Sequence, residues 1–133
     1  MTTLQFTFEK TYKEIDVAGT LYKVNFDDDS MITYQGGFVS YEKKAKELQD
    51  AALDIREATT EKLRAMNLKQ RELMKEAIEL FLGADTFEEL YEKAGRSLMN
   101  LVSLIDYLTK IVEEELRSKA GSLLDEYLIN SKK

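Results

Sequence analysis

The sequence predicts an α+β fold, mostly α-helical, with a small N-terminal antiparallel β-sheet (a hairpin) followed by a helical bundle with one long helix. Two observations predict this: apolar residues recur at every second position over residues 1–29, and at every third or fourth position from residue 30 onward. A length of 133 residues with 44% apolar residues is typical of one domain that can bury a core. We therefore expect a single domain over 1–133, with a hairpin region, 1–29, and a helical region, 30–133.

The first strand is expected close to the start of the chain. Apolar and polar residues alternate there, as a strand that is buried on one face requires. The apolar positions of this alternation are Leu4, Phe6 and Phe8. We expect this segment to belong to the N-terminal sheet.

A hairpin is expected next, with its turn at Ala18-Gly19. A two-residue turn there joins the segments 13–17 and 20–26 and sets their register. The expected opposite pairs are Val17 with Thr20, Ile15 with Tyr22, and Glu14 with Lys23. One face then carries Ile15, Val17, Tyr22 and Val24. The other face carries the Glu–Lys pair, which contributes about 0.2–1 kcal/mol.

Two features mark the start of the helical region. The acidic run Asp27-Asp28-Asp29 suits the positive end of a helix dipole, and we favour this interpretation over a divalent cation site because the spacing of a calcium loop is missing. Gly36-Gly37 predicts a bend, since two glycines cost about 2 kcal/mol relative to alanine inside a helix. A hinge or a close helix contact is favoured there over a phosphate-binding loop, because the glycine pair does not follow a strand.

One long helix is expected over residues 40–82. A series of positions from Ala45 to Leu80 steps by three or four and is apolar except at Thr59 and Gln70, which keeps one face of the helix aligned. At 1.5 Å per residue such a helix is roughly 60 Å long. Because this is long for a domain of this size, we expect the helix to bend near Asn67 or to protrude.

Glycines are expected to end the later helices, and they are Gly83, Gly95 and Gly121. Between them, residues 86–89 (TFEE) form a capping box that begins a short helix, 87–94. Ser97 is expected to cap a helix over 98–116, whose apolar residues cover more than half of its circumference. A last amphipathic segment is expected over 123–129.

The composition excludes several function classes. Without His or Cys the chain can form no thiol nucleophile, Cys/His zinc site, disulfide or Ser-His-Asp triad. A net charge of −6 and a pI of 4.8 argue against binding to nucleic acid or to an anionic membrane. The polar start Met1-Thr2-Thr3 is no signal peptide, so we expect a cytoplasmic protein. Acidic runs such as Glu113-Glu114-Glu115 are expected to face water, so we predict no catalytic residue, metal or cofactor.

The apolar helix 98–116 is the candidate partner-binding site. Together with the stripe 45–80 and the segment 123–129, it offers more apolar surface than a hairpin of fewer than about 30 residues can cover. Its residues form either the core of the domain, or a surface for self-association or for an amphipathic helix of another protein. The candidates for partner binding are Leu101, Leu104, Leu108 and Ile111.

Two short segments carry a resemblance to a known family. TLYKVNFDD (20–28) in the hairpin and FLGADTFEELY (81–91) after the long helix resemble the tail assembly chaperones of long-tailed phages and prophages of Gram-positive bacteria. The resemblance implies a non-enzymatic protein of the bacterial host cytoplasm. It would bind the tape measure protein and help to recruit tail tube protein around it, and we also expect a homo-oligomer.

Other function classes stay open beside this one. A virion structural protein, such as a head–tail connector or a tail terminator, would also be small, acidic and oligomeric, and so would another small interaction protein. A host-directed regulator cannot be separated from a chaperone by the sequence. An enzyme that uses only carboxylates, Lys, Arg, Tyr or Ser is disfavoured, because no convergent set of polar residues is visible in the sequence.

Overall fold

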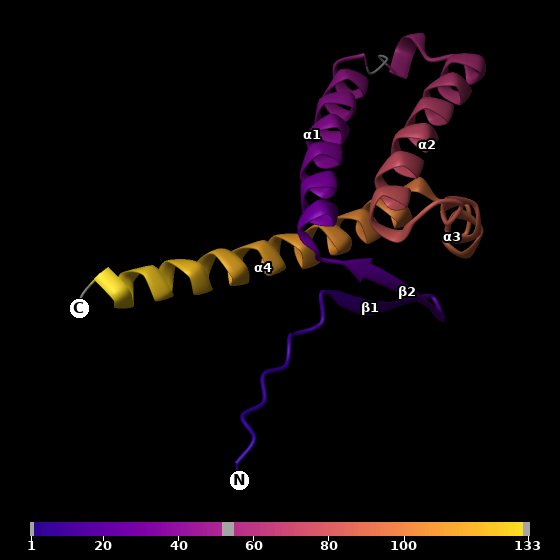
Figure 1. Ribbon diagram of the computed structural model, residues 1–133. Helices are drawn as coiled ribbons and strands as arrows, with labels where there is room; N and C mark the ends of the chain where they lie inside the picture. The colour runs from indigo at the N-terminus through magenta and orange to yellow at the C-terminus, as the bar shows by residue number, and fades with distance from the viewer. Residues whose placement is uncertain (1, 52–54, 132–133) are drawn as a thin grey trace.

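The chain forms a hairpin followed by helices, which confirms the predicted α+β, mostly α class (Figure 1). The structure is a computed structural model that describes the backbone of residues 2–51 and 55–131, and the side chains of 2–51 and 56–118. In chain order the elements are β1 (Tyr12–Val17), β2 (Thr20–Asn25), α1 (Asp28–Asp50), the short 3₁₀ helix η1 (Ile55–Glu57), α2 (Thr60–Leu82), α3 (Phe87–Lys93) and α4 (Leu98–Ser131).

The hairpin has the predicted register. β1 and β2 are antiparallel, with Val17 opposite Thr20 and Ile15 opposite Tyr22. The face predicted to be apolar packs against the helices: Ile15 and Val24 are buried, while Val17 and Tyr22 are half-buried against the core. The prediction of this hairpin is therefore confirmed.

The turn of the hairpin explains why this register is selected. Ala18 and Gly19 have φ angles of 50° and 90°, and a two-residue turn with both φ values positive matches the twist of the two strands. On the outer face Glu14 stands opposite Lys23, as predicted. The Lys23 ammonium lies 4.0 Å from the centroid of the Tyr12 ring, so it also makes a cation–π contact.

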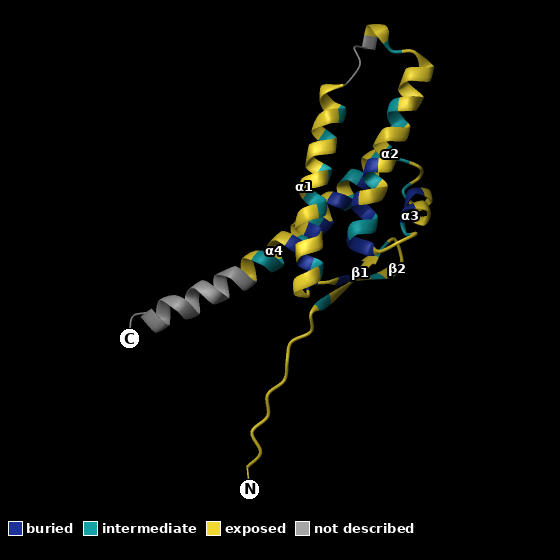
Figure 2. Cartoon of the chain, turned by 45° about the horizontal axis from the view of Figure 1, so that its top comes forward, coloured by how far each residue is buried: buried dark blue, intermediate teal, exposed yellow. Residues whose placement is uncertain are grey.

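The predicted first strand is wrong. Residues 2–10, here termed the N-terminal arm, run away from the hairpin and belong to no sheet (Figures 1 and 2). Leu4, Phe6 and Phe8 are 94%, 79% and 85% exposed. A strand is stable only when a neighbour satisfies its N–H and C=O groups, and an alternating pattern does not supply that neighbour.

The bend predicted at Gly36-Gly37 is also wrong, because α1 continues through both glycines. Gly37 faces α2, and a Cβ atom placed on it would lie 2.5 Å from Cδ2 of Leu80. Gly37 is therefore a close helix contact. The packing of Leu80 into this notch offsets part of the cost of a glycine in a helix.

The predicted helix 40–82 is two helices instead of one. The chain leaves α1, passes through η1 and begins α2 after Thr59, whose hydroxyl accepts a hydrogen bond from the Lys62 backbone N–H at 3.1 Å. The two helices then run side by side in opposite directions and stand on α4 (Figure 1). Of the two outcomes expected for this segment, the bend near Asn67 is wrong, since Asn67 lies inside α2, whereas the outer ends of α1 and α2 do protrude from the rest of the molecule (Figure 2).

The predicted boundaries of the short helix α3 are confirmed within one residue. Gly83 ends α2 with φ of 105°, and Gly95 follows the end of α3 with φ of 72°. Thr86 is the N-cap of α3, but the hydrogen bonds of a capping box are not formed. The Thr86 hydroxyl instead donates to the Gly83 carbonyl oxygen at 2.8 Å, which closes the turn between the two helices.

The last helix, α4, begins as predicted and runs further than predicted. Ser97 Oγ accepts a hydrogen bond from the Asn100 backbone N–H at 3.4 Å. The helix continues through Gly121, so the predicted separation at this glycine is wrong. The side chains of the predicted amphipathic segment 123–129 lie outside the described residues.

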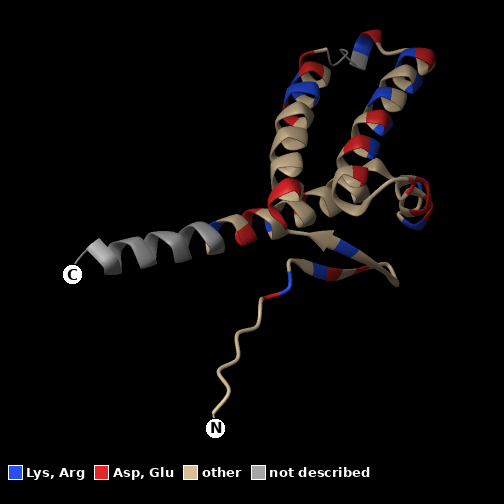
Figure 3. Ribbon diagram, in the orientation of Figure 1, with Lys and Arg blue, Asp and Glu red and all other residues tan. Residues whose placement is uncertain are grey.

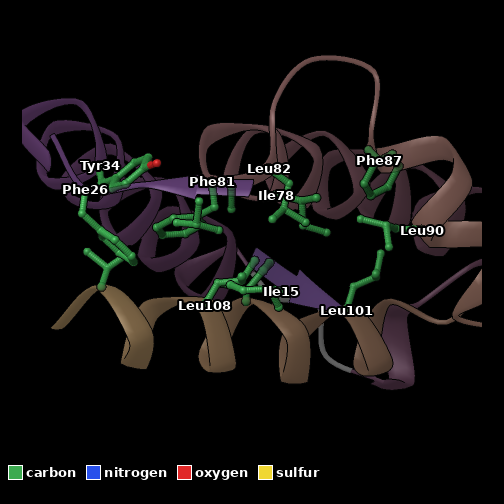
Figure 4. Close-up of a cluster of buried hydrophobic side chains, with 14 of the residues drawn as sticks. Ile15, Phe26, Tyr34, Ile78, Phe81, Leu82, Phe87, Leu90, Leu101 and Leu108 are labelled. Atoms are coloured by element: carbon green, nitrogen blue, oxygen red, sulfur yellow. The ribbon is translucent and has the colours of Figure 1, made fainter. Parts of the chain in front are cut away.

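One core joins the hairpin and the four α-helices (Figure 4). It lies where α4, α3, the hairpin and the inner ends of α1 and α2 meet, and Figure 2 shows that burial is concentrated there. Its most completely buried large side chains are Val24, Phe26, Ile78, Leu101 and Leu108. The outer ends of α1 and α2 project beyond this core.

Candidate functional site

The residues predicted to bind a partner divide into two pairs. Leu101 and Leu108 are each 1% exposed and lie in the core of their own chain (Figure 4). Of the two alternatives for helix 98–116, domain core is therefore the one that applies to these two residues, and they line no surface. Leu104 and Ile111 are half-buried beside that core. For Leu104 and Ile111, partner binding stays a prediction.

The acidic run at 27–29 caps α1. The Asp27 carboxylate accepts hydrogen bonds from the Ser30 backbone N–H at 3.3 Å and from its hydroxyl at 2.6 Å, while Asp28 and Asp29 occupy the first turn. Negative charge stabilises this end of a helix dipole. Across the part of the chain that the structure describes, no group of three or more Asp or Glu side chains is placed to hold a metal ion.

The prediction that the run Glu113-Glu114-Glu115 of α4 faces water is confirmed for the first two residues and is wrong for Glu115, which is half-buried. Glu113 and Glu114 are exposed, and Glu115 lies 3.5 Å from the Lys13 ammonium of β1. This ion pair joins the hairpin to α4 near the surface, where such pairs contribute at most about 1 kcal/mol.

A groove opens between the outer halves of α1 and α2. It has a volume of about 610 Å³, and the start of α4 forms its floor. Most of the side chains that line it are apolar. These residues define the α1–α2 groove: Ala45 and Leu48 of α1, Met66, Leu73 and Met74 of α2, and Leu98, Met99 and Val102 of α4.

The groove exists because the two helices pack closely only at one end. Near the core, Leu80 of α2 fills the notch at Gly37 of α1. Further out, across 35–51 and 56–72, none of the described side chains is fully buried. Apolar side chains such as Leu48 and Met66 therefore remain half-buried and line a channel that other parts of the described chain leave open.

The groove combines an adaptable apolar lining with a few polar groups. Methionine is unbranched and flexible, so Met66 and Met74 can fit partners of different shape. Gln49 and Gln70 offer hydrogen-bond groups along the groove. Burial raises the pKa of Tyr41, with the Asp106 charge adding to the effect, so this phenol stays neutral above its ordinary pKa of 10.0.

One end of the groove carries a positioned positive charge. The Arg96 guanidinium lies 3.0 Å from the Glu92 carboxylate and 5.5 Å from the centroid of the Tyr91 ring. These two contacts hold Arg96 beside Leu98 and Met99 at the start of α4. A polar or acidic group of a bound chain would meet a guanidinium there.

The other side of the helix pair is charged. The Lys44 ammonium contacts both carboxylate oxygens of Glu76, at 3.0 and 2.8 Å, and so links α1 to α2. Glu47, Lys69 and Glu72 surround this pair, and Figure 3 shows both signs of charge along the outer faces of the two helices. This mixed surface is typical of a face in water.

The pattern of the sequence does not predict the groove. Part of the stripe that predicts one helix over 40–82 lines the groove instead, namely Ala45, Leu48, Met66 and Leu73. A signal for the break was present in Thr59-Thr60-Glu61, where a capping hydroxyl precedes an acidic residue in the first turn.

Comparison of the chain with models of known protein families, with curated proteins and with solved structures gives no match. Among the helices of the described residues, none combines the length and the apolar character needed to cross a membrane. The geometry of the groove and the resemblance of the two short segments are therefore the basis for a functional proposal.

Proposed function

We propose that this chain is a non-enzymatic binding protein whose α1–α2 groove holds an amphipathic helix of a partner protein. The observation that carries this proposal is the apolar lining contributed by α1, α2 and α4 around a groove of about 610 Å³. A third helix placed between two splayed antiparallel helices would complete a small bundle, with its apolar residues at i, i+3 or i+4, and i+7 pointing inward.

The resemblance to tail assembly chaperones supplies the identity of the partner. A tape measure protein is long and helical, so it offers many amphipathic segments that aggregate when they are left uncovered. The α1–α2 groove would cover one such segment, and the net charge of −6 would help to keep the complex in solution. In this proposal the protein acts in the bacterial host cytoplasm and delivers the covered tape measure protein to tail tube subunits.

The first test is co-expression of this chain with the longest, most helical protein encoded nearby. A complex that co-purifies and keeps the long protein out of the pellet is the expected result. If the two proteins do not associate, the chaperone proposal is wrong. Recovery of this chain in purified phage particles at a stoichiometric amount would instead indicate a virion structural protein.

A matched pair of variants locates the binding site. Met66→Glu places a charge inside the groove, and Leu68→Glu places the same charge on α2, where Leu68 is 55% exposed outside the groove. With a synthetic amphipathic peptide from the co-purified protein, Met66→Glu should weaken binding at least about tenfold, which is about 1.4 kcal/mol. Leu68→Glu should stay within about twofold of the unchanged protein, and circular dichroism checks that both variants are folded. Equal effects of the two variants would place binding elsewhere.

A further inference from the structure

We propose that the N-terminal arm of one copy of this chain pairs with the outer edge of β1 in a second copy. The arm presents three large apolar side chains to water at 94%, 79% and 85% exposure, namely Leu4, Phe6 and Phe8. They alternate with polar residues, as in a strand whose one face is covered. The arm thus has the sequence pattern of a strand but has no neighbouring strand among the described residues of its own chain.

The local backbone argues against pairing of the arm with its own β1. The Thr11 carbonyl oxygen still accepts a hydrogen bond from the Phe26 N–H at 2.6 Å, so the chain is in line with the hairpin at this residue. A return onto β1 would need a tight turn within Glu9 and Lys10. Such turns favour Gly, Asn or Asp, which this segment lacks. The arm instead leads away from the hairpin (Figure 1).

The edge of β1 is available in every copy. The sheet has only the two strands β1 and β2 among the described residues, so the outer edge of β1 pairs with no strand there. Unpaired N–H and C=O groups along a strand edge are a template for a strand from another chain. Here the identical chain carries both the template and a strand that fits it.

An apolar surface lies beside that edge. The Lys13–Glu115 ion pair places the start of β1 along one side of α4. At 100° per residue, Leu104 and Ile111 lie on the same side of α4 as Glu115, whereas Leu98 and Val102 face the α1–α2 groove. Leu104 and Ile111 are only half-buried, so the apolar face of an added strand would cover them.

The area is sufficient for a stable dimer. Two phenylalanines and a leucine bury about 500 Å² per arm, and reciprocal exchange of two arms buries about 2,000 Å² when the covered surfaces are included. Specific interfaces need about 1,200 Å² or more. Reciprocal exchange also leaves no arm uncovered, whereas addition to one side only would build an open chain of molecules.

Light scattering of the purified full-length protein tests the association. We expect a dimer, and we expect the triple variant Leu4→Ser, Phe6→Ser, Phe8→Ser to raise the dissociation constant at least 100-fold without changing the melting temperature of the monomer. The matched control replaces Thr3 and Thr7 by Ser and should remain dimeric. A monomeric unchanged protein at high micromolar concentration, or a triple variant that still dimerises, would overturn the proposal.

Disulfide cross-linking tests the contact between the arm and β1 directly. The chain contains no cysteine, so the introduced cysteines are the only thiols that can react. Copies with Thr7→Cys in the arm are mixed with differently tagged copies that carry Asp16→Cys or Glu14→Cys in β1. A disulfide between the two tags is expected with at least one of these β1 positions. In a second experiment one chain carries both Thr7→Cys and the β1 cysteine. If a disulfide forms within that chain while none forms between the two tags in the mixture, the arm pairs with its own β1 and the proposal is wrong.

The inference does not depend on the proposed function, and the two can fail separately. Met66→Glu should weaken peptide binding at least about tenfold while leaving the dimer intact. The triple arm variant should lose the dimer while its α1–α2 groove still binds the peptide. If the arm variant loses peptide binding and leaves the oligomeric state unchanged, the arm serves the partner protein and the exchange between copies is refuted.

Discussion

Replacement of the two neighbouring glycines of α1 tests how closely α1 packs on α2. A Cβ atom on Gly36 would have no heavy atom within 4 Å, so Gly36→Ala should stabilise the fold by about 0.5–1 kcal/mol through helix propensity alone. A Cβ atom on Gly37 would lie 2.5 and 2.7 Å from the two Cδ atoms of Leu80. The same gain is then opposed by overpacking, which costs about 1–3 kcal/mol.

The expected net effect of Gly37→Ala is a loss of about 0–2 kcal/mol, so the two variants should differ by about 1–3 kcal/mol. Urea unfolding followed by circular dichroism measures this difference directly. In a chain of this length each kcal/mol shifts the melting temperature by about 3–5 °C. The reference is Leu80→Ala, in which the side chain that fills the notch is removed.

Leu80→Ala turns the comparison into a double-mutant cycle. In that background Gly37→Ala should become stabilising by about 0.5–1 kcal/mol, as at Gly36, because the added methyl group meets no side chain. If Gly37→Ala stabilises the unchanged protein as much as Gly36→Ala does, Leu80 moves aside freely and the notch is not a close contact. The explanation of why α1 continues through both glycines would then fail.

Three further changes probe the core, the turn and the dependence on pH. Leu108→Ala should lower the free energy of unfolding by about 2–5 kcal/mol in urea, whereas Met99→Ala, at a 77% exposed position, should change it by less than about 0.5 kcal/mol. Ala18→Gly should raise the melting temperature, because it removes the strain of alanine at φ of 50°. Burial raises the pKa of Tyr34 above its ordinary value of 10.0, so the stability from this residue is complete below pH 10 and is lost as pH rises through the higher folded-state pKa. Unfolding of the unchanged protein should therefore become easier above pH 10, and the change should be smaller in Tyr34→Phe.

The parts of the fold that depend on local chemistry could be predicted from the sequence. The hairpin follows from Ala18-Gly19 and from the alternation on either side, since a two-residue turn sets the register of the strands that it joins. Gly83 and Ser97 mark helix ends for similarly local reasons. None of these predictions requires knowledge of the tertiary contacts that the rest of the chain makes.

The parts that depend on tertiary contacts could not be predicted in the same way. The stripe from Ala45 to Leu80 continues across the break between α1 and α2, because stripe residues of both helices line the same α1–α2 groove. When apolar residues surround most of a helix, as in 98–116, the sequence also cannot show which side of the helix packs against the rest of the chain. For this reason the sequence cannot separate Leu101 and Leu108, which are buried in the core, from the half-buried Leu104 and Ile111. The alternating pattern of the arm predicts a strand, but a strand is stable only beside a second strand that satisfies its N–H and C=O groups.

The uneven packing of the α1–α2 pair sets a gradient of backbone protection. Met31 and Tyr34 are the only buried residues of α1, and those of α2 begin at Leu73, so both helices are anchored at one end. Amide hydrogens in the anchored turns should exchange with solvent only on global unfolding, and those toward Asp50 and Thr60 should exchange through local opening at lower free energy. Any molecule that occupies the groove would slow this opening, so its arrival could be followed by hydrogen exchange at the tip of the pair.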